Sequence, residues 1–165
     1  MEIWDAYLSD GTPAGCDLIR GEPIPAGLYH LVCEILVRHV DGSYLLMQRD
    51  LRKKGYPGRW EATAGGSALK GEDVLACARR ELLEETGLVG TLTAIGRYVA
   101  KDTIYRQYLC VTAYDKATVT LQEGETIDFC WLDEDAFVAL AKSGRIVDRQ
   151  LRRFRSYFEK RRIPV

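Results

Sequence analysis

The sequence lacks the features that mark several specialised classes of protein. No apolar run approaches the length that a membrane span requires. No two of the five cysteines are spaced as CxxC, which argues against a zinc site and against a redox dithiol. The net charge is −1, so no overall field favours a nucleic acid or a membrane surface as partner. Repeats and low-complexity tracts are missing as well, which excludes a repeat array.

A secretion signal is also missing from the N-terminal stretch MEIWDAYLSDG, which is acidic and has no hydrophobic core. An odd number of cysteines without such a signal predicts reduced thiols and a cytoplasmic protein. We expect each cysteine to be a small, mostly buried core residue rather than a nucleophile. The five are Cys16, Cys33, Cys77, Cys110 and Cys130.

What is present is typical of a globular protein, with 47% hydrophobic and 28% charged residues. A chain of 165 residues is expected to form one domain, 1–165, with a substantial core. Hydrophobic periodicity and turn residues predict strands, then a helix, then strands, then helices. This order favours a mixed sheet with helices packed on it, an α/β fold.

The elements expected from the pattern are as follows. A first strand covers 2–8 and a turn-rich connection covers 11–27. A hairpin covers 29–49, because apolar and β-branched residues flank Asp41-Gly42, a pair that suits a tight turn. A loop with one short central strand covers 50–66. The remaining elements are a helix at 71–87, strands within 91–102, 104–115 and 118–132, and helices at 133–144 and 145–162.

The helix at 71–87 carries an unusual group of acids. At about 100° per residue, Glu85 lies roughly 40° from Glu81 and Glu84 roughly 60° to its other side, so the three share one face. Like charges at these spacings repel. Magnesium and similar hard cations prefer several carboxylate oxygens, and a bound dication would make the group favourable. Asp73 or Glu72 is expected near the start of the helix, and Gly87 suits a left-handed cap at its end.

Residues 66–88 resemble the Nudix box at every defining position. Five residues separate Gly66 from Glu72, and seven separate Glu72 from Arg80-Glu81-Leu82. After one further residue comes Glu84-Glu85, and after one more comes Gly87-Leu88. So many defined positions at defined gaps make a specific signal. The resemblance implies an α/β/α sandwich with a mixed sheet, in which the box forms a loop–helix–loop.

The resemblance also implies a metal-dependent pyrophosphohydrolase. Its substrate would be a nucleoside diphosphate derivative or a related organic diphosphate, and water would attack phosphorus. Glu81, Glu84 and Glu85 would hold Mg²⁺ or Mn²⁺, with the carbonyl of Gly66 completing the shell. Arg80 would serve catalysis structurally, by pairing with Glu72 and fixing the geometry of helix and loop.

The carboxylate that takes the proton from water is not at one position throughout this family. Glu84 is one candidate. Glu125 is another, because GETIDFCW resembles the acidic loop before the Trp-containing strand of Nudix proteins. Glu123 is a weaker third, and a solvated loop is an equally good interpretation of Glu123 and Glu125.

Residues 2–140 further resemble the Nudix branch that contains type I isopentenyl-diphosphate isomerase. By that resemblance Arg49 and Lys53 would contact the diphosphate. Ordinary loop solvation is the alternative for Lys53, Lys54 and Arg59, and we expect it for at least one of the three. The isomerase has a catalytic Cys where this chain has Gly65, and a metal-binding His where it has Ser67. The stretch IYRQYLC also lacks the isomerase's glutamates. These departures favour an isomerase-related hydrolase over an isomerase.

The C-terminal stretch 145–162 carries eight Arg or Lys against two acids. It is expected to be a basic amphipathic helix that packs Ile146, Leu151, Phe154 and Phe158 inward. A nucleic-acid partner is not expected, and a small-molecule diphosphate is. His30 is expected to be a packed strand residue, and Tyr105 gives only a weak hint of a dinucleotide polyphosphate substrate.

Two alternatives to hydrolysis stay open at this level, namely an isomerase-like activity and a non-catalytic nucleotide-binding module. The sequence leaves open the identity of the substrate and the oligomeric state, with a homodimer among the arrangements allowed.

Overall fold

Strand β3 (His30–His39) lies at the centre of a mixed sheet in the computed structural model, which describes all 165 residues. It runs parallel to β8 (Thr103–Thr112), in register from His30–Thr103 to His39–Thr112. β8 forms an antiparallel hairpin with β7 (Thr91–Ala100). The sheet has seven strands, five of them in the order β5-β4-β3-β8-β7, while β6 pairs with β3 and β9 with β4.

The turn predicted at Asp41-Gly42 is confirmed, but the strands on either side of it diverge at once. The N–H of His39 donates to the carbonyl of Ser43 at 2.8 Å, and Gly42 has φ +100°. β3 and β4 (Tyr44–Arg49) then pair only at Arg38–Tyr44. The hairpin predicted over 29–49 is therefore confirmed at its turn, but its ladder is short, because strands from other parts of the sequence take over the pairing of β3 and β4.

Two short strands, rather than the single one expected, fill the gap between β3 and β4. β5 (Trp60–Ala62) pairs with β4, and β6 (Ala64–Ser67) pairs with β3. Thr63 joins them with φ +56°, a conformation that a β-branched residue rarely adopts. Its hydroxyl donates to the carbonyl of Leu45 at 2.8 Å and accepts from the N–H of Val37 at 3.1 Å. Thr63 thus ties together the backbones of the two diverging strands.

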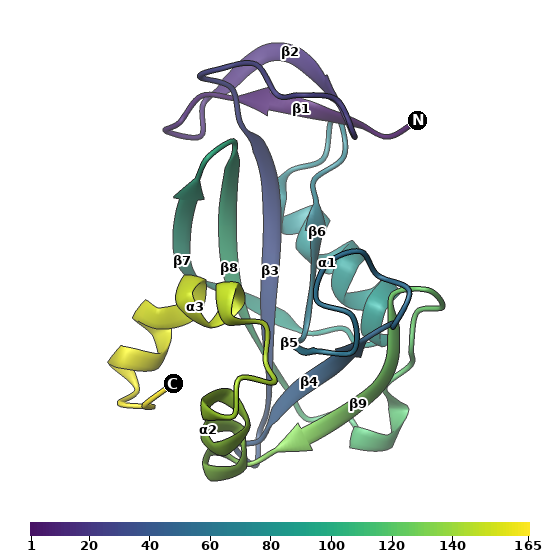
Figure 1. The fold of residues 1–165 in the computed structure, drawn as a ribbon, viewed down its shortest axis with the longest axis vertical. Coiled ribbons are helices and arrows are strands. Elements are labelled where there is room, and N and C mark those ends of the chain that lie inside the picture. Colours follow the sequence, from purple (N-terminus) through teal and green to yellow (C-terminus); the bar gives the residue numbers. More distant parts are fainter.

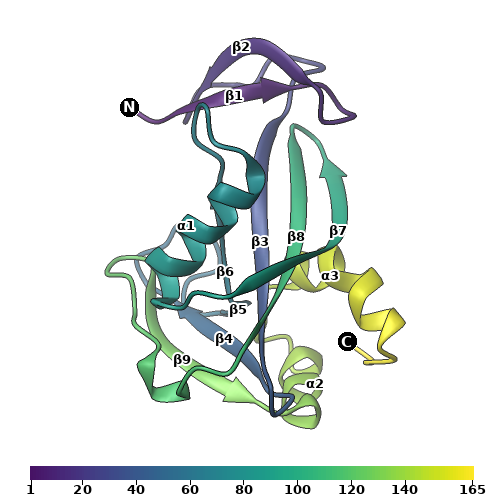
Figure 2. The same cartoon turned by 180° about the vertical axis from the view of Figure 1, so that it is seen from behind.

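The alternation of side chains on β3 divides the molecule into layers. Ile35 and Val37 belong to one core cluster together with Leu82 of α1 (Val74–Thr86). Leu36 belongs to the other, which contains side chains of α2 (Glu134–Lys142) and α3 (Asp148–Lys160). Figure 1 shows α2 and α3 in front of the sheet, and Figure 2 shows α1 in front from the opposite side. The predicted α/β/α sandwich is confirmed.

The turn-rich connection expected at 11–27 contains a strand that the sequence did not predict. β2 (Pro13–Ile19) pairs antiparallel with β1 (Ile3–Tyr7), and the two form a separate sheet. The hairpin lies across one end of the main sheet (Figure 1). Pro, Gly and Asp give β2 a poor intrinsic strand propensity, so its pairing with β1 and the burial of Leu18 beside Trp4 supply its order.

The segment 118–132 is a strand only in its second half. A 3₁₀ turn (Lys116–Thr118) and a loop precede β9 (Thr126–Leu132). At the C-terminus, α3 occupies most of the helix expected at 145–162, while Ile146 forms a bridge with Trp60 before the helix begins. Phe154 and Phe158 are buried, as predicted. No helix has both the length and the apolar character needed to cross a membrane.

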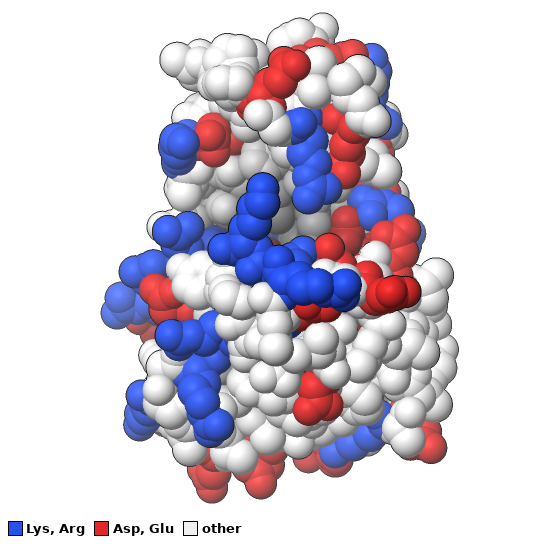
Figure 3. Space-filling model, turned by 45° about the vertical axis from the view of Figure 1, so that its right-hand side comes forward, with Lys and Arg blue, Asp and Glu red and all other residues white.

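Charged side chains are unevenly distributed over the face of the molecule shown in Figure 3. Figure 3 shows Lys and Arg side chains gathered across the middle of one face, with Asp and Glu side chains beside them. Acidic and basic groups therefore lie next to each other on this face, although the net charge of the chain is only −1.

Candidate active site

Helix α1 presents the acidic face of the site. Asp73 caps its start, and the Asp73 carboxylate accepts from the N–H groups of Leu75 and Ala76, both at 2.8 Å. Gly87 ends it with φ +70°, while its N–H donates to the carbonyl of Leu83. Both caps rest on local sequence, and they fix the register that places the three box glutamates on one side of the helix.

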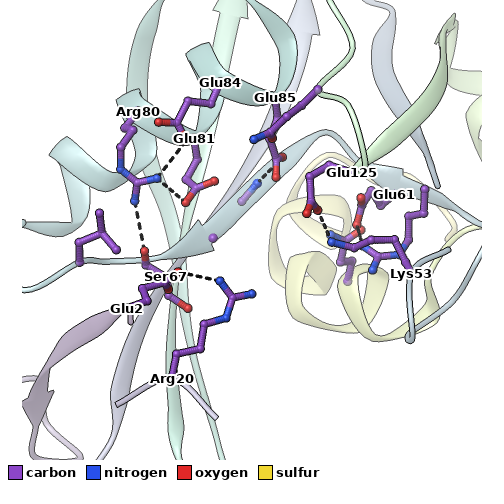
Figure 4. Close-up of a pocket in the computed structure, with 16 residues that line it drawn as sticks. Glu2, Arg20, Lys53, Glu61, Ser67, Arg80, Glu81, Glu84, Glu85 and Glu125 are labelled. Atoms are coloured by element: carbon purple, nitrogen blue, oxygen red, sulfur yellow. Dashed lines mark hydrogen bonds and ion pairs between the residues drawn. The ribbon is translucent and has the colours of Figure 1, made fainter. Parts of the chain in front are cut away.

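Arg80 connects this helix to the preceding loop. Its Nε and Nη2 donate to the two carboxylate oxygens of Glu72, each at 2.9 Å. Its Nη1 donates to Glu81 at 2.8 Å and to Glu84 at 3.2 Å, and its Nη2 also reaches the carbonyl of Ser67 (Figure 4). The pairing of Arg80 with Glu72 that the resemblance implies is therefore present, and the same guanidinium partly neutralises Glu81 and Glu84.

Two glycines of β6 form the floor beneath the carboxylates. The Glu81 carboxylate packs directly on the Cα of Gly66, where a Cβ would lie 2.7 Å from Oε2 and overlap Oε1. The N–H of Gly65 donates to Oε2 of Glu85 at 3.1 Å. A Cβ on Gly65 would overlap the carbonyl oxygen of Cys33 on the neighbouring strand. Glycine at both positions thus follows from close packing, against a side chain at 66 and against backbone at 65.

The opposite side of the site carries cations that pair with further acids. Lys53, in the loop after β4, forms an ion pair with Glu125 in the loop before β9. Arg49, at the end of β4, donates to Glu61 of β5 at 2.7 Å and to the carbonyl of Gly55 at 2.9 Å. Figure 4 shows Lys53, Glu125 and Glu61 together, with Glu85 between them and the group around Arg80.

The three box glutamates, Arg80, the two glycines and the two cation–carboxylate pairs line one cavity of about 360 Å³. Leu69 is the only hydrophobic residue among the sixteen that line it. Eight residues proposed from the sequence face this cavity, namely Arg49, Lys53, Gly66, Arg80, Glu81, Glu84, Glu85 and Glu125. A cavity with so many charged groups suits a charged, hydrophilic ligand better than an apolar one.

Sequence reasoning missed several residues of the cavity. Glu61 is the most important, because its carboxylate is largely buried and lies near Glu85. Glu2 and Arg20, from the β1–β2 hairpin, form an ion pair at 2.7 Å at the edge of the cavity. Their places depend on strand pairing between distant segments, and no local pattern could have identified them. The other residues missed are Leu69, Gln122 and Gln150.

Other candidates lie elsewhere. Glu123 is exposed and does not line the cavity, in contrast to Glu125, two residues further on. Lys54 and Arg59 are also exposed and outside it. His30 stacks on Trp4 with ring centroids 4.5 Å apart, which supports the interpretation of a packed strand histidine. Tyr105 lies outside the cavity, beneath the guanidinium of Arg153.

Burial and mutual repulsion change the pKa values of several carboxylates in the cavity. Burial raises the pKa of Glu85 well above its ordinary value, and the neighbouring Glu61 and Glu81 raise it further. Burial also raises the pKa of Glu61, although Arg49 opposes the shift, and that of Glu81, although Arg80 opposes it. Several buried acids that raise one another's pKa form an arrangement that a cation would stabilise.

The donor set fits a hard dication, although no three acidic, His or Cys side chains are already arranged as a metal site. Arg80 instead contacts Glu81 and Glu84, and Lys53 contacts Glu125. Carboxylate and carbonyl oxygens are the ligands that Mg²⁺ and Mn²⁺ prefer, and no thiol or imidazole lines the cavity.

Comparison with known families identifies this arrangement. The family profile described as NUDIX domain matches residues 28–154. The chain belongs to the Nudix family. Its relatives include the uncharacterized Nudix hydrolase lmo0368 of Listeria monocytogenes, which is 31% identical over 152 residues and aligned over 89% of each chain. The uncharacterized Nudix hydrolase YfcD of Escherichia coli is 32% identical over 114 residues, covering 68% of this chain and 63% of YfcD.

Solved structures share the Nudix fold at low sequence identity. DR0079 from Deinococcus radiodurans superimposes with a TM-score of 0.71 at 16% identity, over 87% of this chain and 91% of its own. The NUDIX domain of Shewanella oneidensis NrtR, complexed with ADP ribose, gives 0.64 at 17% identity, over 86% and 94%. As a Nudix hydrolase, the protein acts on phosphorus-containing acid anhydrides. Its placement in the isomerase-like branch stays a prediction.

Proposed function

We propose that this Nudix hydrolase cleaves a diphosphate linkage in a nucleoside diphosphate derivative or a related organic diphosphate, with Mg²⁺ or Mn²⁺. The observation that carries the proposal is the meeting of the box acids with Lys53, Arg49 and Glu125 in a single, almost wholly polar cavity. The partner is therefore a small, anionic molecule.

Glu81, Glu84 and Glu85 would hold the metal, together with the carbonyl of Gly66. When bound, the metal would neutralise phosphate charge and lower the pKa of a coordinated water. Gly65 contributes by fixing Glu85 through its N–H, and Arg80 by holding the helix against the loop through Glu72. Neither Gly65 nor Arg80 needs to touch the substrate to do so.

Arg49 and Lys53 bind the diphosphate. Each pairs with a carboxylate of the chain, Arg49 with Glu61 and Lys53 with Glu125. A diphosphate carries more negative charge than one carboxylate, so it competes for both cations. When Lys53 turns to the phosphate, Glu125 loses its partner and faces the reacting phosphorus as a free carboxylate.

We assign the proton acceptor to Glu125. It shares the cavity with the diphosphate-binding cations and comes from the loop before β9, not from α1. Glu84 is the competing candidate, and its side chain is 47% exposed and contacts Arg80. Placing the base opposite the metal ligands leaves Glu84 available as a ligand.

Two other activities fit the site less well. An isomerase would require reactive groups where Gly65 and Ser67 stand, and β8 offers no acid in IYRQYLC. The second alternative is a module that binds a nucleotide without catalysis. The complex of the NrtR NUDIX domain with ADP ribose shows that such a domain binds a nucleotide, but here the complete box favours turnover.

The five cysteines all carry free thiols. Because thiols stay reduced in the cytoplasm, we place the protein there.

The test is hydrolysis of a panel of nucleoside and non-nucleoside diphosphates with Mg²⁺ or Mn²⁺, measured by release of phosphate or nucleotide. Glu85→Gln should raise the metal concentration needed for half-maximal rate. Glu125→Gln should lower kcat by roughly 10²–10⁴-fold, the usual contribution of a general base. Glu123→Gln is the matched control, because it lies on the same loop outside the cavity, and it should leave both quantities unchanged.

The results would distinguish Glu125 from Glu84 as the base, and hydrolysis from nucleotide binding and isomerisation. A larger loss of kcat in Glu84→Gln at saturating metal, with Glu125→Gln nearly intact, would move the base to Glu84. Tight nucleotide binding without turnover under either metal would establish the binding module instead. Conversion of isopentenyl diphosphate to its isomer would establish the isomerase.

A further inference from the structure

A second hollow adjoins the catalytic cavity on the face of the sheet that α3 covers. It has a volume of about 290 Å³ and shares four lining residues with the catalytic cavity, namely Arg49, Glu61, Gly65 and Gln150. Tyr56 and Tyr105 also line it, from the loop after β4 and from β8. The two hollows are therefore neighbours, and a ligand that occupied both would pass these four shared residues.

A third hollow, of about 470 Å³, continues from the second. The two share Tyr105, Arg149 and Arg153. The charge changes sign along this path. The catalytic cavity has six glutamates against four cations. The third hollow has four cations against a single acid, Asp102, and two of the cations are Lys101 and Arg152.

Arg153 is held in place and forms part of the wall. Its Nε donates to both oxygens of the buried Glu34, each at 2.8 Å, and its guanidinium lies 4.2 Å from the ring centre of Tyr105. The charge of Arg153 is thus already matched by Glu34, and its role is to fix α3 against the sheet.

The other cations of the third hollow are available to a ligand. Arg149 forms no ion pair with a carboxylate of the chain and lies over the ring of Tyr56 at 5.8 Å. Arg152 pairs only with Asp148, and both side chains are more than half exposed. Lys101 is 3.7 Å from Asp102 and 90% exposed. Exposed pairs of this kind are weak, so an anion with several oxygens can displace them.

Helix α3 uses different residues to line the hollows and to pack on the core. Arg149, Arg152 and Arg153 are spaced three and four residues apart and lie along one side of the helix, toward the hollows. Phe154 and Phe158 belong to the core beneath α3. Three of the five basic residues of α3 therefore line the hollows, whereas Arg155 and Lys160 do not.

We propose that the substrate is a nucleoside 5′-diphosphate compound that carries a further phosphate on its ribose. Its diphosphate would lie in the catalytic cavity and its nucleoside in the second hollow, which Tyr56 and Tyr105 line. The additional phosphate would bind Arg149 together with Arg152 and Lys101. This inference rests on the proposed function and names the substrate class of the same site.

The experiment compares adenosine 5′-diphosphate with its 2′-phosphorylated and 3′-phosphorylated forms under the same metal concentration. We expect kcat/KM to be at least about tenfold higher for one phosphorylated form, the factor that corresponds to one charge-assisted hydrogen bond. The gain should appear in KM. In the double variant Arg149→Gln, Arg152→Gln, the preference ratio should fall to about one.

Arg145→Gln is the matched control. Arg145 is exposed, has no carboxylate partner and lies outside the second and third hollows, so the preference should persist in that variant. Equal kcat/KM for all three nucleotides would overturn the inference, as would a preference that survives in the double variant. Hydrolysis of other diphosphates but of none of these three would also overturn it. Absence of hydrolysis across the whole panel would instead count against the proposed function.

Discussion

Gly65 and Gly66 are adjacent, yet the structure predicts that alanine will have different effects at the two positions. Gly66→Ala should lower the activity, and Gly65→Ala should lower the stability of the fold. At Gly66 the three atoms nearest to a new Cβ all belong to the carboxylate of Glu81, at the far end of a flexible side chain. At Gly65 it would meet the backbone of β3, overlapping the carbonyl oxygen of Cys33 and lying 3.2 Å from the Cα of Glu34.

The geometry sets the size of each effect. In Gly66→Ala the Glu81 carboxylate must move by about 1 Å or more, and a displacement of that order in an active site can lower the rate about 100-fold. The fold should tolerate this change. In Gly65→Ala the backbone must shift, and overpacking of this kind costs roughly 1–3 kcal/mol. At about 2–4 °C per kcal/mol for a chain of this size, the thermal midpoint should fall by roughly 2–12 °C.

The assay pairs kcat/KM on the best diphosphate of the panel with thermal denaturation of each variant. Gly55→Ala is the control, because its Cβ would meet nothing within 4 Å and its φ is not positive. It should match the parent in both measurements. A fully active Gly66→Ala variant would refute the placement of Glu81 against this glycine. A Gly65→Ala variant as stable as the parent would refute the close contact between β6 and β3.

Three further predictions concern stability and reactivity. Arg153→Met should destabilise the fold by about 3–5 kcal/mol in urea denaturation, because it leaves Glu34 buried and unpaired. Adding Glu34→Leu should restore most of the lost stability, and additive losses in the double variant would contradict this reasoning. Asp73→Ala should cost about 1 kcal/mol, because two N–H groups lose their acceptor, and an unchanged urea midpoint would argue against the cap. With a thiol reagent at pH 8, exposed Cys16 should react first. Burial raises the pKa of Cys130 to about 11, so Cys130 should react slowly. The three buried thiols should react only when the protein unfolds.

Local sequence accounts for most of the acidic half of the site. The spacing of Glu81, Glu84 and Glu85 places them on one helical face whatever the helix packs against. Asp73 and Gly87 set the ends of that helix through their own side chain and backbone. These are interactions over a few residues, and a single sequence contains all the information that they need.

The other half of the site depends on pairing between distant segments. Glu61 faces Glu85 only because β5 pairs with β4, while β6 pairs with β3. Before the structure, nothing distinguished Glu61 from an ordinary loop acid. The separation of Glu125 from Glu123 has the same origin, since the pairing of β9 with β4 brings Glu125 toward Lys53.

The sequence by itself determined the family, the α/β class and the helix that carries the box acids, because each follows from local spacing and periodicity. Only the tertiary structure decided that β1 and β2 form a hairpin, that β3 and β4 diverge, and that a basic hollow beside α3 adjoins a second hollow next to the catalytic cavity. The physical reason is that strand pairing and the meeting of helix with sheet join residues far apart in the chain. Their energies come from burial and backbone hydrogen bonds that no local segment contains.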